Sequence, residues 1–124
     1  MSVPILKLGD FLIASAQAEL LDTDWEELRR ELLEKSGRLR SKGAIVDISV
    51  MDVLDSFAAR TLRDTVHALR LRGSECVIVG IQPDVAFAMA QLGLRLEGVT
   101  TALDLEEGME TLRQKISPRS AHAG

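Results

Sequence analysis

The amino-acid sequence predicts an α/β fold, in which one domain holds a mixed, mainly parallel β-sheet with an N-terminal hairpin and about four packed α-helices. Its 124 residues suffice for a single hydrophobic core. Short apolar runs alternate with segments of helical apolar spacing, an order typical of parallel strands joined by helices. Gly9-Asp10 separates two short apolar stretches near the start, which predicts a two-residue hairpin turn.

The first predicted elements are the hairpin and a long helix. Residues 4–8 and 11–14 form the two hairpin strands. Thr23 and Glu26 have the spacing of a capping box, so we expect the first helix to begin there. It should run to about residue 42, because Gly43 is suited to end it. Its apolar face consists of Trp25, Leu28, Leu32 and Leu39.

The middle of the chain predicts a central strand, a second helix and another buried strand. Residues 44–48 are apolar except for Asp47, as expected of a strand covered on both faces. The second helix spans about residues 56–72 and ends at Gly73. The next strand spans residues 76–80. The apolar face of the helix consists of Ala59, Leu62, Val66 and Leu69.

The last part predicts a third helix, a short strand and a fourth helix. Pro83 suits the first turn of the third helix, and Gly93 marks its end. A strand at residues 99–102 leads to a helix capped by Asp104 and Glu107. We expect residues 1–116 to form the domain and the polar tail, residues 117–124, to be disordered. The two helices present Val85, Met89 and Leu92, then Leu105, Met109, Leu112 and Ile116.

Composition and charge narrow the function classes. The net charge of −4 argues against a nucleic-acid binder, which would need cations to neutralise phosphates. No segment has the length and apolarity of a membrane span or a signal peptide. The single cysteine, Cys76, lies in an apolar run, which indicates a buried thiol in a reducing cytoplasm. We therefore expect a cytoplasmic protein with a protein partner.

Few side chains suit an enzyme, a metal site or a cofactor. His67 and His122 have no cysteine or histidine at metal-ligand spacing, so we interpret them as structural or solvated. No phosphate-binding glycine loop or nucleophile elbow occurs. Asp52 and Asp55 could pair at a metal or in acid–base chemistry, but a turn former and a helix N-cap explain them better.

Ser56 is the side chain most open to a functional interpretation. It stands at the predicted start of the second helix, after a central strand, at the sheet edge where α/β folds place their sites. The serine could be a second capping residue. Alternatively, it is a phosphate acceptor, whose modification would add negative charge to a loop that already carries Asp52 and Asp55.

A basic stripe runs down the second helix beside its apolar face. Its members recur at three- and four-residue spacing and begin one turn below Ser56. Such a stripe is usually solvated surface. It could also receive an acidic partner or hold a phosphate on Ser56. The stripe consists of Arg60, Arg63, His67 and Arg70.

Three long stretches carry a family resemblance: VPILKLGDFLIAS, IVDISVMDVLDSFAARTL and VIVGIQPDVAFAMAQLGLRLEGVTTALDLEEGME. They resemble the STAS domain of anti-sigma-factor antagonists, and within that family the RsbS-like scaffolds of the bacterial stressosome. The related RsbR-like proteins carry an added N-terminal sensor domain and usually a phosphorylated threonine on the third helix. This chain begins at the first strand, and its third helix has no serine or threonine, so the RsbS-like branch is the closer match.

The resemblance implies a non-enzymatic scaffold and switch without a cofactor. Such a scaffold co-assembles with RsbR-like paralogues in a large complex, sequesters an RsbT-like switch kinase, and releases it when phosphorylated. A PP2C-type phosphatase resets it. The phosphorylated serine of the family corresponds to Ser56, with Asp52, Asp55, Phe57 and Arg60 as the switch loop and kinase contact.

Two other classes stay open. A free-standing anti-sigma-factor antagonist would bind its kinase directly, as a monomer or dimer. A small nucleotide-binding domain or enzyme would need a phosphate cradle that this sequence does not display. Whether Thr100 or Thr101 is modified is left open, since both suit a strand end.

Overall fold

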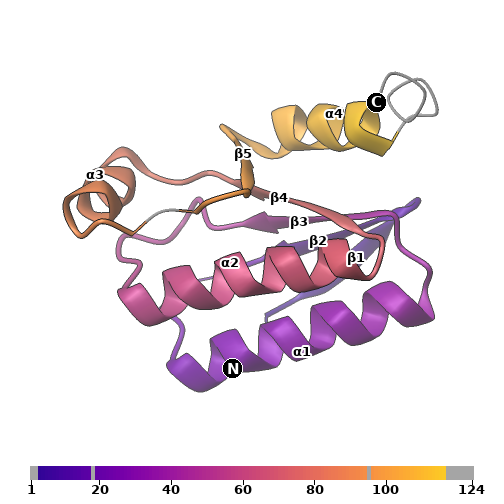
Figure 1. The fold of residues 1–124 in the computed structure, drawn as a ribbon, viewed down its shortest axis with the longest axis horizontal. Coiled ribbons are helices and arrows are strands. Elements are labelled where there is room, and N and C mark those ends of the chain that lie inside the picture. Colours follow the sequence, from indigo (N-terminus) through magenta and orange to yellow (C-terminus); the bar gives the residue numbers. More distant parts are fainter. Residues whose placement is uncertain (1–2, 18, 95, 117–124) are drawn as a thin grey trace.

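The computed structural model describes residues 3–17, 19–94 and 96–116, in which a five-stranded sheet has the order β1-β2-β3-β4-β5. Helices α1 and α2 lie side by side on one face, and α4 covers the other (Figure 1). The elements are β1 (Ile5–Leu8), β2 (Phe11–Ser15), α1 (Asp22–Arg38), β3 (Gly43–Asp47), α2 (Ser56–Leu71), β4 (Glu75–Val79), α3 (Pro83–Gln91), β5 (Thr100–Ala102) and α4 (Leu105–Ile116).

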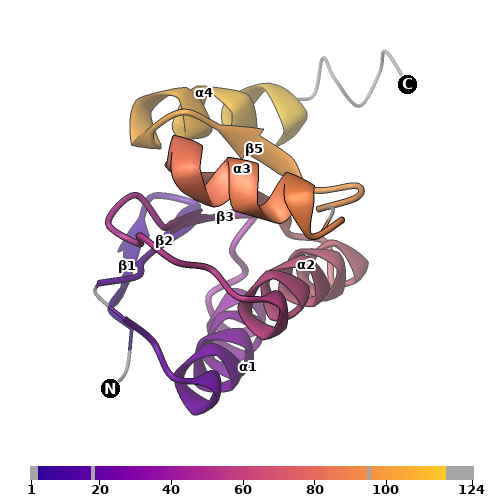
Figure 2. The same cartoon turned by 90° about the vertical axis from the view of Figure 1, so that its left-hand side faces the viewer.

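The predicted mixed, mainly parallel sheet with an N-terminal hairpin is confirmed. Strand β1 pairs antiparallel with β2, and the pairs β2–β3, β3–β4 and β4–β5 are all parallel. Leu8 faces Phe11 across the hairpin, so Gly9-Asp10 is the turn, and Gly9 has the positive φ of 62° that glycine adopts without strain. Because β2–β5 are parallel, their carboxyl ends meet at one edge, beside α3 (Figure 2).

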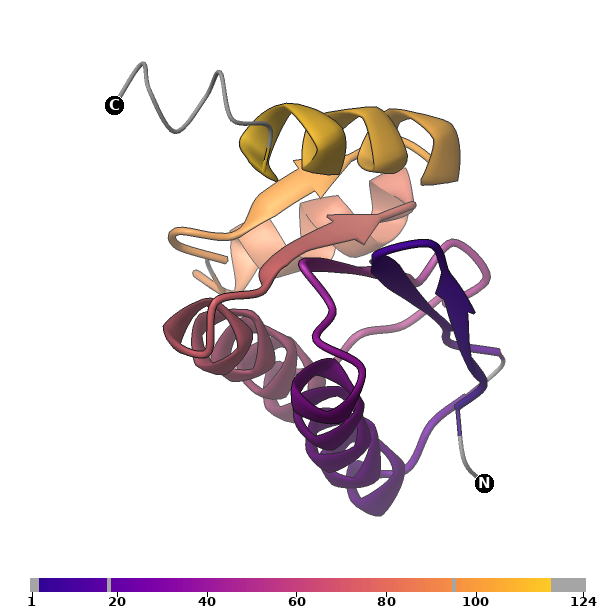
Figure 3. The same ribbon diagram turned by 90° about the vertical axis from the view of Figure 1, so that its right-hand side faces the viewer.

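Hydrophobic side chains fill both faces of the sheet. The larger cluster lies between the sheet and α1 and α2 and contains Trp25, the only tryptophan. The smaller one lies under α4, on the sheet face opposite α1 and α2 (Figure 3). It contains Leu112, Ile45 and Val77. Strands β3 and β4 are therefore buried on both faces, which explains their nearly uninterrupted apolar sequence.

The start of α1 differs from the expected one. Leu21 is the N-cap, and its backbone N–H donates to Asp24 Oδ2 at 2.8 Å. The capping box predicted for Thr23 and Glu26 is wrong, because Asp24 rather than Glu26 makes the reciprocal bond one turn in. The helix consequently begins at Asp22, slightly earlier than the Thr-x-x-Glu pattern indicates.

The end of α1 also comes earlier than expected. The Ser41 N–H donates to Ser36 O at 2.9 Å and the Arg40 N–H to Gly37 O at 3.3 Å, which is the Schellman pattern of a helix end. Arg40, with φ 51°, takes the left-handed position. Gly43 is therefore not the helix stop. It opens β3, where an added Cβ would meet the Leu112 side chain at 3.0 Å.

The later elements follow the predictions closely, except at Leu92 and at Leu105, which belongs to the predicted apolar face of the fourth helix but is 39% exposed. Pro83 lies in the first turn of α3, and Asp104 Oδ1 accepts the Glu107 N–H at 2.9 Å before α4. Leu92 does not share the buried face with Val85 and Met89: it caps the C-terminus of α3 and is exposed. The predicted tail lies outside the described residues. Within the described parts, no helix is long and apolar enough to span a membrane.

Candidate functional site at the start of helix α2

The carboxyl edge of the sheet brings Asp55 and Ser56 to the start of α2. Asp55 is the N-cap, as predicted, and its Oδ1 accepts the Ala58 N–H at 2.8 Å. Ser56 is the first helical residue. The structure therefore assigns the capping bond to the aspartate, and among the described residues no bond supports the alternative that the serine is itself a cap.

The Ser56 hydroxyl does not stabilise the fold by a hydrogen bond in the part of the chain that the structure describes. Its residue is half-buried, and its Oγ makes no hydrogen bond to another described residue. At the first turn of a helix, the leading backbone N–H groups lack intrahelical acceptors and the helix end carries partial positive charge. The hydroxyl thus stands where an attached anion would be stabilised locally.

The loop from β3 to α2 is fixed at its base. Asp47 Oδ1 accepts the Ser49 N–H at 2.9 Å, and the Gln82 side chain donates to Ser49 O at 2.7 Å. Gly80 lies so close that an added Cβ would meet Ser49 Cβ at 2.6 Å. Met51 is buried in the core. These contacts therefore hold the loop, and with it the N-terminus of α2, in a fixed position.

Two valines of this loop are exposed beside the serine, although apolar residues usually turn inward. Val50 is 58% and Val53 73% exposed. They border a hollow of about 410 Å³ with Glu19 and Asp52, and Val53 also lines a second hollow of about 230 Å³ with Asp55. The loop that leads to Ser56 therefore presents apolar side chains with an acidic border, a composition suited to a protein partner.

Phe57 and Arg60 complete the predicted switch region with different roles. The Phe57 ring is partly buried against the larger core and anchors the first turn of α2. Arg60 is exposed, and it lies on the same helix face as Ser56 because the two are four residues apart. Asp52 is exposed in the loop. Kinase contact by these residues stays a prediction.

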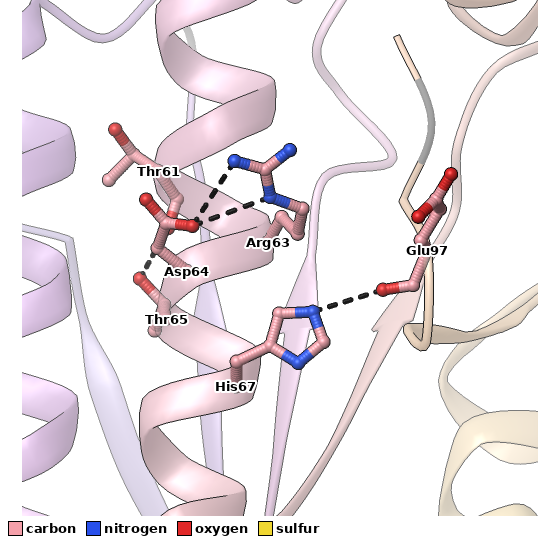
Figure 4. A network of polar contacts seen from close by, with 6 residues as sticks. All are labelled: Thr61, Arg63, Asp64, Thr65, His67 and Glu97. Atoms are coloured by element: carbon pink, nitrogen blue, oxygen red, sulfur yellow. Dashed lines mark hydrogen bonds and ion pairs between the residues drawn. The ribbon is translucent and has the colours of Figure 1, made fainter.

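The basic stripe divides into two parts. Arg63 lies 3.4 Å from its neighbour Asp64, whereas His67 Nε2 contacts Glu97 O at 3.0 Å (Figure 4). Arg70 donates to Gly98 O at 2.9 Å. His67 and Arg70 thus hold the loop before β5. Arg60 is the exposed cation of the basic stripe that lies nearest to Ser56. The structural interpretation of His67 is confirmed.

Cys76 is remote from this region. It is fully buried in β4, and burial is the largest cause that raises the pKa of its thiol from 9.0 to about 12. Neighbouring Arg70 opposes that rise and Glu75 adds to it. The predicted burial of the thiol is confirmed. Among the described residues, no group of His, Cys, Asp and Glu side chains is arranged to hold a metal ion.

Sequence reasoning missed the contribution of Glu19, Val50 and Val53. Residues 49–55 contain four apolar and three polar side chains, so the sequence does not show which of the apolar ones are exposed. Glu19 belongs to the loop before α1, and its proximity follows from the parallel pairing of β2 with β3. Only the assembled sheet edge brings these residues together.

The fold and this site define a class of protein. The family model for the STAS domain matches residues 2–108, and the chain belongs to the STAS domain family. Among solved structures, it is similar to a serine-to-glutamate variant of RsbS from Moorella thermoacetica. That match is 36% identical with a TM-score of 0.78, and covers 90% of this chain and 95% of the other.

Two further comparisons agree with this relationship. One solved structure describes the molecular architecture of the stressosome, a signal integration and transduction hub. A chain of that structure is 32% identical to this one, with a TM-score of 0.75, and the match covers 92% of this chain and 99% of that one. The RsbT co-antagonist protein RsbRA of Bacillus subtilis is 27% identical over 112 residues, 90% of this chain. The chain spans only 41% of the length of RsbRA.

Proposed function

We propose that this protein is a non-enzymatic, RsbS-like scaffold of a cytoplasmic stressosome and that Ser56 is its phosphorylation switch. Unmodified, the surface around Ser56 binds an RsbT-like kinase. Phosphorylation of Ser56 by that kinase releases it, and a PP2C-type phosphatase restores the binding state. RsbR-like paralogues are the proposed co-assembly partners, a role supported by the similarity to RsbRA.

The observation that carries the proposal is the Ser56 hydroxyl, which forms no hydrogen bond with another described residue and stands at a fixed helix start. Asp55 satisfies the α2 cap, so the hydroxyl is available without loss of a structural bond. Its exposed neighbours Val50 and Val53 offer the apolar contact that a bound kinase needs. The proposed phosphorylation site and the proposed kinase-binding residues thus belong to one surface.

Electrostatics explain how one phosphate could release a partner. Asp52 and Asp55 already make the loop acidic, and phosphorylation adds about −1.5 to −2 charges at neutral pH. The helix start and Arg60 stabilise this charge locally. The apolar contact through Val50 and Val53 is nevertheless weakened, because a hydrated dianion must lose water to enter that interface.

The test is phosphorylation by the cognate RsbT-like kinase with ATP, followed by intact-mass measurement and peptide mapping. We expect one added phosphate on Ser56 in the wild type and none in Ser56→Ala. Ser49→Ala is the matched control, since Ser49 is an exposed serine of the same loop and should leave the modification unchanged. A phosphate that persists in Ser56→Ala would refute the switch.

A further inference from the structure

An exposed apolar surface lies on the sheet face that carries α4, away from Ser56. Leu6 and Leu8 of β1 are 66% and 54% exposed. They pair with Ile13 and Phe11, which belong to the cluster under α4, so all four side chains share that face. Leu8 also lines a hollow of about 930 Å³ with Leu105 of α4. An exposed apolar area of this kind is typical of an interaction surface.

The hollow has an acidic rim. The residues that line it include four carboxylates, of Asp104, Glu106, Glu107 and Glu110, and one cation, Arg113. Asp104 caps α4 and Glu110 pairs with Arg113 at 3.1 Å, but Glu106 and Glu107 form no ion pair with any described residue. We call Leu6, Leu8, Leu105, Glu106 and Glu107 the acidic surface. A partner that fits it brings apolar side chains flanked by cations.

A surface of that chemistry exists on the chain itself, at the end of α1. Residues 35–42 contain Lys35, Arg38, Arg40 and Lys42 and no carboxylate, with Leu39 partly exposed among them. Arg38 pairs with Glu34 at 3.9 Å, so Lys35, Arg40 and Lys42 are the cations left among the described residues to meet the carboxylates of residues 104–110. We call residues 35–42 the basic surface.

Arg40 provides an independent indication that the basic surface has a use. Among the described residues, it is the one non-glycine residue with positive φ, at 51°. Glycine is the usual residue at this position of a Schellman motif, because a side chain there crowds the backbone. Arg40 is exposed and forms no ion pair within the described residues. A cation at a strained, exposed position points to a contact outside the protomer.

The arrangement allows one copy to use both surfaces together. Helix α1 ends on one side of the sheet, whereas α4 begins on the opposite side (Figure 1). A two-fold contact between two acidic surfaces would place like charges together, so the complementary contact joins unlike surfaces.

We propose that this chain self-associates head to tail, with the acidic surface of one copy bound to the basic surface of the next. This inference rests on the assembly part of the proposed function and deepens it, because repeated unlike contacts build rings or larger particles. It does not involve Ser56, so the phosphorylation test can fail or succeed independently.

The experiment is sedimentation velocity on the purified chain at about 0.05 M and about 0.5 M salt, where the Debye length falls from roughly 14 Å to roughly 4 Å. We expect concentration-dependent oligomers at low salt that dissociate at high salt. Glu106→Lys with Glu107→Lys should abolish them, and so should Arg38→Glu with Lys42→Glu. Mixing the two double variants should restore association, because each supplies the surface that the other has lost.

A matched control changes the net charge equally but elsewhere. Asp84→Lys with Glu97→Lys reverses two exposed carboxylates, one of them in the first turn of α3, and should leave association intact. A wild-type chain that stays monomeric at low salt would overturn the proposal. So would normal association of the Arg38→Glu, Lys42→Glu variant, or failure of the mixture to associate.

Arg40→Gly separates a contact role from a structural one. Glycine relieves the positive φ, so the melting temperature should rise by about 4 °C. Self-association should nevertheless weaken at least about threefold, as expected for the loss of one exposed charge contact. A more stable variant that associates as strongly as the wild type would remove Arg40 from the contact.

Discussion

At the residue scale, Asp55 and Ser56 show how a structural and a functional side chain stand next to each other. Asp55 accepts a backbone N–H and fixes the helix start. Ser56 contributes no hydrogen bond within the described part of the chain. Sequence reasoning found both residues and assigned the cap to Asp55. It could not decide whether Ser56 also caps, because either residue type accepts the same bond and only the geometry selects one.

The two residues should therefore respond differently to alanine. Asp55→Ala should lower the free energy of unfolding by about 1 kcal/mol, since it leaves the Ala58 N–H without its acceptor. Ser56→Ala should change it by less than about 0.5 kcal/mol. Urea unfolding followed by circular dichroism measures both. An equal loss of unfolding free energy in both variants would show that the Ser56 side chain also caps the helix.

Cys76 makes a prediction about alkaline stability. Burial holds its folded-state pKa at about 12, above its ordinary value of 9.0. The folded state therefore keeps its proton while the unfolded state loses it, so the stability contribution is complete below pH 9 and falls as the pH rises from 9 towards 12. Between pH 7 and pH 10, urea unfolding of the wild type should lose more stability than that of Cys76→Ala. Parallel curves would contradict the buried-thiol account.

At the element scale, the sequence predicted every helix and strand but misplaced both ends of α1. Thr23 and Glu26 matched a capping box, yet the Leu21 N–H bonds to Asp24. At the other end, the sequence pattern predicted that Gly43 ends the helix, but Arg40 is the residue in the left-handed conformation. Several residues within one turn satisfy the same local rule, and tertiary packing selects among them.

Helix α4 depends on a glycine for its approach to the sheet. An added Cβ at Gly108 would meet Val79 Cγ1 at 2.6 Å, inside the smaller core. Gly108→Ala should therefore destabilise the fold by roughly 1–3 kcal/mol, although alanine is the better helix former.

Gly37 of α1 is the matched control for Gly108. An added Cβ there meets the flexible end of Arg72 at 2.6 Å, which can move aside. Gly37→Ala should be neutral or stabilising. Chemical denaturation of both variants checks the pair, and a neutral Gly108→Ala would show that α4 sits less closely on β4 than described.

At the scale of the whole molecule, the fold class and the mainly parallel character of the sheet followed from the order of apolar runs, because parallel strands require helical crossovers. The partner surface did not follow, since Glu19 and Val53 meet Asp55 only at the assembled sheet edge. Likewise, the free surface of the basic stripe could not be foreseen, because contacts to the loop at Glu97 occupy part of it.

Particle size distinguishes the scaffold from a free-standing antagonist. With an RsbR-like paralogue, we expect a co-assembly many times larger than the 13.6 kDa chain. Light scattering of the mixed proteins, with each protein alone as the control, measures it. A monomer or dimer that binds kinase tightly and never enters a large particle would favour the antagonist.

The most direct test of the central claim is the affinity of the RsbT-like kinase for this protein before and after phosphorylation of Ser56. Isothermal titration calorimetry of the two forms, with Ser56→Ala carried through the same ATP treatment, gives the comparison. We predict at least about a tenfold loss of affinity on phosphorylation, which equals ~1.4 kcal/mol, and no loss for Ser56→Ala. Equal affinity of the phosphorylated and unmodified forms would contradict the proposed switch.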